Sequence, residues 1–136
     1  MRYDATAAPG NADDKWNLVC DDITRPATLT YHSTTRLADA TWFIGELCDL
    51  NTDDTGIGNV ERCDLDTNTW TTMTMTSEAQ AVRHRHAAVA CRGRIYVTGG
   101  LSKTLAGTSV AVYDPIVNSW TPLPDMTIPR HDDSAL

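Results

Sequence analysis

Two stretches of the sequence repeat one another and decide the fold. Val60–Trp70 reads VERCDLDTNTW, and Val110–Trp120 reads VAVYDPIVNSW. A valine, an aspartate, an asparagine and a tryptophan occur at the same places in both stretches, without a gap. Together with Trp16, the two tryptophans recur at an interval of about 50 residues, which indicates repeated units rather than one unrepeated domain.

The segments around this phrase have the character of short β-strands. Residues 87–91, 94–98 and 109–113 are short apolar runs bounded by turn residues. Gly99 and Gly100 follow one of these runs, where backbone passes close to backbone or φ is positive. No stretch has helical periodicity, so the sequence predicts an all-β fold. The large tryptophan side chains would fill the space between neighbouring units.

The best-preserved unit has a characteristic order of residues. It runs from Arg83 through Gly99–Gly100 and Tyr113–Asp114 to Trp120, and it restarts at Arg130. This order resembles a kelch repeat, and residues 59–70 further resemble the repeats of animal BTB-kelch proteins. The resemblance implies four-stranded antiparallel blades of a β-propeller, about eleven strands in all.

The resemblance also divides the chain into four parts. These are a partial blade with its connection at residues 1–28, a degenerate repeat at 29–82, a well-preserved repeat at 83–129, and the start of another at 130–136. In the degenerate repeat, Glu46 replaces a glycine and Cys63 replaces the tyrosine.

The length allows an incomplete propeller only. A chain of 136 residues holds about two full blades, whereas a closed propeller typically has about four to eight. Two explanations stay open. The chain is a piece of a longer protein, which we favour because it begins and ends within a blade, or several copies self-associate to complete the propeller.

Charge and cysteine content restrict the partners and the compartment. The net charge of −7 disfavours nucleic acid and anionic membranes, which both reward a basic surface. No apolar run has the length of a transmembrane span, and the N-terminus does not begin a signal peptide. The four cysteines are far apart, with no C-x-x-C pair. We therefore expect free thiols in a reducing compartment, the cytoplasm, rather than two disulfides.

Arginines are the first candidates for partner binding. Arg83 and Arg130 occupy the same repeat position. In propellers of the BTB-kelch type this arginine lies at the mouth of the central channel, where in several proteins it binds acidic peptides. A guanidinium group suits such carboxylates. The structural alternative is that it hydrogen-bonds backbone carbonyls between blades. Arg85, and Ser102 and Lys103 in a connecting loop, complete the predicted partner-binding set.

Metal, cofactor and catalytic sites find little support in the sequence. On a strand, His84 and His86 would point away from the neighbouring arginines, and His32 aligns with His86 one repeat earlier. No Cys/His spacing completes a tetrahedral metal site, so we expect neither metal nor cofactor. The Asp49–Asp54 segment lacks the glycine and the glutamate of a calcium loop. Without a nucleophile elbow or a phosphate-binding glycine loop, we expect no enzyme.

The sequence therefore predicts a protein–protein interaction module with a protein or acidic peptide as partner. By the resemblance to BTB-kelch proteins, the parent presents substrates to a cullin-type ubiquitin ligase. Two alternatives stay open, because one fold hosts many functions. One is a fragment of a kelch-propeller enzyme, an oxidase or a sugar isomerase. The other is an actin-binding or cytoskeletal protein.

Overall fold

In the structure, a computed structural model, the described residues form β-strands and their connections. It describes residues 2–3, 16–17, 32–45, 60–73, 83–101 and 107–131, and no helix occurs among them. The strands are β1 (Arg2–Tyr3), β2 (Trp16–Asn17), β3 (Ser33–Leu37), β4 (Ala40–Ile44), β5 (Val60–Asp64), β6 (Thr69–Met73), β7 (Ala87–Cys91), β8 (Arg94–Thr98), β9 (Val110–Asp114) and β10 (Ser119–Leu123). The all-β prediction is confirmed. The further strand expected after Arg130 lies outside the described residues.

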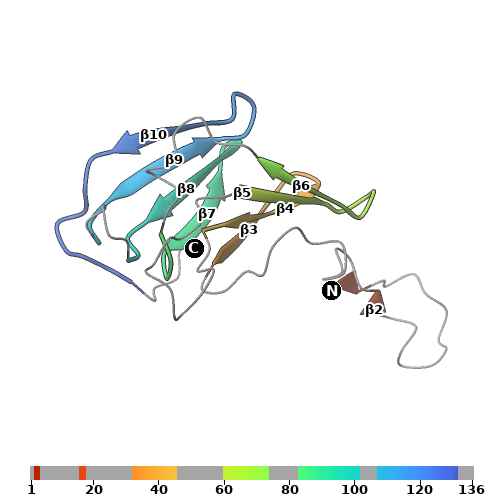
Figure 1. Cartoon of the computed structure of the whole chain (residues 1–136), viewed down its shortest axis with the longest axis horizontal. Helices are drawn as coiled ribbons and strands as arrows, with labels where there is room; N and C mark the ends of the chain where they lie inside the picture. The colour runs from red at the N-terminus through yellow and green to blue at the C-terminus, as the bar shows by residue number, and fades with distance from the viewer. Residues whose placement is uncertain are drawn as a thin grey trace.

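The strands form a short pair and two four-stranded sheets. β1 pairs with β2, the first sheet has the order β3-β4-β5-β6, and the second has the order β7-β8-β9-β10. All pairs are antiparallel, and neighbours in sequence are neighbours in the sheet. The two sheets contact each other mainly through β3 and β7, the first strand of each (Figure 1).

The repeated aspartate and asparagine form the turn between the last two strands of each sheet. Asp64 and Asp114 each accept a hydrogen bond from a backbone N–H of the following turn, at 2.9 and 3.0 Å respectively. Asn68 and Asn118 end these turns with φ of 54° and 50°. Asparagine tolerates this left-handed backbone better than most residues, and aspartate closes a turn through its side chain. The phrase that revealed the repeat is therefore a turn-forming sequence.

The core lies between the two sheets, which bury facing apolar sides. Alternation along each strand sends every second side chain into this core. The buried side chains are Ala40, Trp42, Ile44 and Val60 from the first sheet, and Ile95, Val97, Ala111, Tyr113 and Trp120 from the second. The rings of Trp42 and Tyr113 meet across the interface, with centroids 5.8 Å apart. Each such large side chain contributes about 1.5–3 kcal/mol by leaving water, so this interface holds the sheets together.

The two sheets are equivalent strand by strand. β3 begins at Ser33 and β7 at Ala87, 54 residues later, while β5 begins at Val60 and β9 at Val110, 50 residues later. Strand lengths agree throughout, so only the connection between the second and third strands differs, by four residues. The two equivalent four-stranded antiparallel sheets share one core between them. This arrangement is consistent with blades of an incomplete propeller.

The outer side of the second sheet carries a row of partly exposed side chains. Val89, Tyr96 and Val112 lie opposite one another on β7, β8 and β9. Tyr96 stands where the first sheet has Trp42, which is buried against the second sheet. The face of the first sheet that carries Trp42 is covered by the second sheet. The equivalent face of the second sheet, which carries Tyr96, is partly exposed.

The cysteines differ from the prediction. Cys63 is disulfide-bonded, with a partner outside the described residues, while Cys91 is a free and exposed thiol. The expectation of free thiols is therefore wrong for Cys63. Cytoplasmic localisation remains a prediction that the cysteines no longer support, because disulfides persist in oxidising compartments. Among the described residues, no helix has the length and apolarity needed to cross a membrane.

Candidate functional site

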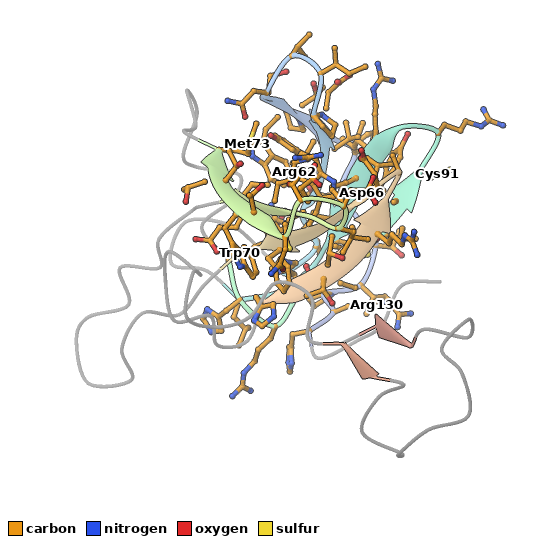
Figure 2. All side chains as sticks on the ribbon, turned by 90° about the vertical axis from the view of Figure 1, so that its right-hand side faces the viewer. Arg62, Asp66, Trp70, Met73, Cys91 and Arg130 are labelled. Carbon is orange, nitrogen blue, oxygen red and sulfur yellow. The ribbon has the colours of Figure 1, made fainter. Side chains whose placement is uncertain are left out.

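Three segments of the chain meet at one end of the second sheet. His84 and Leu101 exchange two backbone hydrogen bonds, of 3.0 and 2.8 Å. The next residue back, Gly100, donates its N–H to the carbonyl of Arg130 at 2.8 Å. We call this region, made of residues 83–86, 99–101 and 130–131, the arginine end. Arg130 lies low in Figure 2, well below Arg62.

Two glycines make the close approach of these segments feasible. Gly45 has φ of 73° and Gly99 has φ of 65°. A Cβ on Gly45 would overlap the carbonyl oxygen of Arg83, and a Cβ on Gly99 would overlap that of Arg130. Each glycine therefore lies against the backbone of an arginine, Arg83 or Arg130. Only a residue without a side chain leaves room for this contact. The equivalence of Arg83 and Arg130, read from the sequence, holds in space.

Arg83 is a buried residue of the repeat. It is 2% exposed, and its guanidinium donates to the backbone carbonyls of Gly99 at 3.2 Å and Ser109 at 3.3 Å. Burial lowers its pKa from 12.5 to about 10, and the negative charge of Asp125 opposes this shift. The group stays charged at neutral pH and fastens the ends of β8 and β9. This matches the structural alternative, with the carbonyls in the arginine's own sheet rather than between blades.

Arg85 and Arg130 lie closer to the surface than Arg83. Arg130 is exposed and Arg85 is half-buried. Arg85 has φ of 55°, so residues 83–86 do not form the alternating strand that their sequence suggested. The strand begins only at Ala87, and Arg83 and His86 are both buried as a result. His84, the residue before Arg85, is hydrogen-bonded to Leu101, and Arg130 is hydrogen-bonded to Gly100, so the backbone of both surface arginines lies at one end of the sheet.

The two remaining residues of the predicted set are not placed. Ser102 and Lys103 lie outside the described residues, although Leu101, which precedes them, belongs to the arginine end. Leu101 and Ile128 are large apolar side chains that are 38% and 61% exposed.

His86, which belongs to the arginine end, connects the two sheets. Its Nε2 lies 2.6 Å from Oγ of Ser33. Further along the same two strands, the N–H of Ala90 donates to Oγ1 of Thr35 at 3.0 Å. Burial lowers the pKa of His86 from 6.5 to about 3, with contributions from the positive charge of Arg83 and from other histidines. His86 is therefore neutral at physiological pH.

No metal site is found where the chain is described. Those residues contain no group of three or more histidine, cysteine or acidic side chains placed to hold an ion. His84 and His86 do not act as a pair, because His86 turns inward to Ser33.

The second sheet, with the arginine that precedes it, is one complete repeat. Residues 83–127 match the Kelch motif. No curated protein matches the chain. The kelch repeat thus begins at the buried Arg83 and includes all four strands of the second sheet, whereas Arg130 lies beyond the matched residues. That Arg130 opens another unit stays a prediction. Whether these arginines bind a partner stays a prediction.

Sequence reasoning missed the contacts between the two sheets. Ser33, Thr35 and His86 are ordinary polar residues, and nothing in their spacing shows that they meet. The one available signal was the alignment of His32 with His86 at the repeat position where the sheets approach each other.

Proposed function

We propose that this chain is a protein-recognition module that binds acidic segments of a partner through the arginine end of its kelch repeat. The single observation that carries this proposal is that His84, the residue before Arg85, and Arg130 are both hydrogen-bonded through their backbones to the Gly100–Leu101 segment. Kelch repeats generally mediate protein interactions, which supports the class of function. The acidic nature of the partner is supported by the positive charge of these arginines in a chain whose net charge is −7.

Leu101 and Ile128 broaden the proposed surface. Both side chains are partly or largely exposed, and they lie on the segments that carry or adjoin the arginines. A partner segment that combines carboxylates with an apolar side chain would use both features. Arg83 contributes by holding the loop ends in place rather than by touching the partner.

We propose further that the chain is not an enzyme. The one serine–histidine pair that the described residues bring into hydrogen-bond distance is Ser33 with His86. A general base works best when its pKa is near the working pH, and the lowered pKa of His86 makes it a weak base. The pair is better explained as a structural contact between the sheets.

The role of the parent protein is a proposal of its own. The resemblance of residues 59–70 to BTB-kelch repeats favours an adaptor that presents substrates to a cullin-type ubiquitin ligase in the cytoplasm. Co-purification of the natural full-length protein with a cullin would support this role, and its absence from cullin complexes would contradict it.

Peptide binding tests the recognition surface. An array of peptides rich in aspartate and glutamate is probed with the wild-type chain, and the best peptide is then titrated by fluorescence anisotropy. We expect Arg130→Gln and Arg85→Gln each to weaken binding by about tenfold, because each removes a charged hydrogen-bond donor from the surface.

A matched variant separates surface recognition from net charge. Arg92 is an exposed arginine in the turn between β7 and β8, at the other end of the same sheet. Arg92→Gln removes the same charge, so binding should be unchanged within about twofold. Equal losses in all three variants, or no selection of acidic over basic peptides, would overturn the proposed surface.

A further inference from the structure

His86 occupies a tight joint between the two sheets. Its side chain is 5% exposed, and its Nε2 lies 2.6 Å from Oγ of Ser33 at the start of β3. A Cβ added to Gly45, at the end of β4, would overlap the imidazole ring. A Cβ added to Gly100, after β8, would overlap the Cβ of His86. The His86 side chain is thus buried between the two sheets.

The described charged groups that act most strongly on the imidazole of His86 are basic. Arg83, His32 and His84 act on the imidazole, and each disfavours a positive charge on it. The backbone carbonyl of Ile44 acts in the opposite direction but is a smaller influence than burial and the arginine. The other titratable side chains on β3, β7 and β8 are Arg36, Cys91 and Arg94, toward the far ends of these strands, and Tyr96, in the middle of β8. Burial and these neighbouring cations therefore both disfavour a protonated His86.

We propose that His86 makes the contact between the two sheets sensitive to acid, so that protonation of its imidazole separates β3 from β7 beside the arginine end. A protonated ring repels Arg83, whose guanidinium fastens the ends of β8 and β9. Acid therefore loosens the support of the segments that carry Arg85 and Arg130. A partner held at the arginine end would be released as the pH falls.

The direction follows from proton linkage. The folded form holds His86 with a pKa of about 3, below its ordinary value of 6.5, so folding favours the neutral ring. The contribution to stability is complete above pH 6.5 and is lost as the pH falls below that value. Between pH 7.5 and pH 5.0, these two pKa values make opening of the joint roughly 30-fold more favourable.

Hydrogen exchange on the intact wild-type chain tests the proposal directly. The N–H of Ala90 donates to Oγ1 of Thr35 across the joint, so its protection reports contact between the sheets. After correction for the intrinsic exchange rate, we expect its opening constant to rise about 30-fold between pH 7.5 and pH 5.0. The amide of Arg62, on β5 within the first sheet, should change much less. Equal changes at both amides, or none at Ala90, would overturn the proposal.

A matched pair of variants assigns the effect to His86. His86→Asn keeps a neutral polar side chain that does not titrate in this range, and the acid-dependent loss at Ala90 should disappear. His131→Asn removes an exposed histidine of the arginine end and should leave the loss intact. If His86→Asn does not fold, an NMR titration of the His86 imidazole in the wild-type chain tests the proposal instead. A His86 ring that titrates near pH 6.5 in the folded chain would contradict the proposal.

Discussion

The two sheets have the same strands in the same register, and yet they secure their shared geometry with different residues. The aspartate of the repeated turn is an example. In the second sheet Asp114 is bound by Arg94 from the neighbouring strand, at 2.9 Å. In the first sheet Asp64 is bound by Arg62 from its own strand, also at 2.9 Å. Both sheets therefore have an arginine–aspartate ion pair at this turn, but the arginine comes from a different strand in each.

The aromatic contacts of the repeated tryptophan differ in the same way. In the second sheet Trp120 packs against Tyr113, with ring centroids 5.2 Å apart, and Tyr113 donates its hydroxyl hydrogen bond to Asn118 at 2.8 Å. Cys63 takes the place of this tyrosine in the first sheet. There Trp70 packs against Phe43 on β4 instead, at 4.9 Å. The space beside each tryptophan is filled by a ring from a different strand.

The comparison teaches that the repeat preserves contacts more strictly than residues. A search for Tyr-Asp or for a double glycine finds the second sheet readily and the first sheet poorly. The geometry depends on a capped turn, an aromatic partner for tryptophan and a glycine at the end of the second strand. More than one set of residues meets these needs.

The largest effect is expected when the tyrosine of the second sheet is replaced by cysteine, the residue at the equivalent position of the first sheet. Tyr113→Cys removes a fully buried ring that contacts both Trp42 and Trp120. We expect the free energy of unfolding to fall by about 4 kcal/mol, because no phenylalanine replaces the lost volume. Urea denaturation followed by tryptophan fluorescence measures the loss. Tyr113→Phe keeps the ring and loses only the bond to Asn118, so it should cost about 1 kcal/mol. Similar losses in the two variants would contradict the importance of the ring.

Glycine substitutions test the element that both sheets share. Gly45→Ala and Gly99→Ala each place a Cβ against the backbone of the following repeat, in addition to backbone strain from a positive φ. We expect each to cost about 2–3 kcal/mol in urea denaturation. Gly93→Ala is the matched control, since Gly93 has φ of 78° but nothing within 4 Å of an added Cβ. It should cost about 1 kcal/mol. Equal costs at all three positions would mean that strain alone, and not the contact between repeats, requires the glycines.

The smallest expected effect concerns the two turn aspartates. The pKa of Asp64 is lowered to about 2, chiefly by the backbone N–H of Thr67, with Arg62 contributing less. The pKa of Asp114 is lowered chiefly by the side chain of Arg94. Arg94→Ala should therefore raise the pKa of Asp114 more than Arg62→Ala raises that of Asp64. Carboxyl carbon shifts in an NMR titration measure both. Because both folded values lie below the ordinary one, the stabilising contribution is lost as the pH falls below about 4. A larger shift at Asp64 would reverse the assignment.

Much of the fold could be read from the sequence, because turns and alternation are local. The repeated stretches ending in Trp70 and Trp120 gave the position of the last two strands of each sheet. The repeat boundary at Arg130 stays a prediction. The joint at His86 could not be read, since it depends on how two sheets pack. The disulfide at Cys63 was also beyond reach, because connectivity does not follow from cysteine spacing. The turn at Arg85 was hidden because a positive φ is not expected of an arginine.

The contacts of Gly45 with Arg83 and of Gly99 with Arg130 also suggest which stretch of the chain could be duplicated as a unit. Residues 83–129 contain an arginine that settles onto the preceding glycine, together with a glycine ready to receive the arginine that follows. A copy of this stretch inserted before Arg130 would bring both halves of its connections with it, so no new boundary would have to be invented. Lengthening such a protein by this whole stretch would therefore keep each of these glycines against the backbone of an arginine at the new junction.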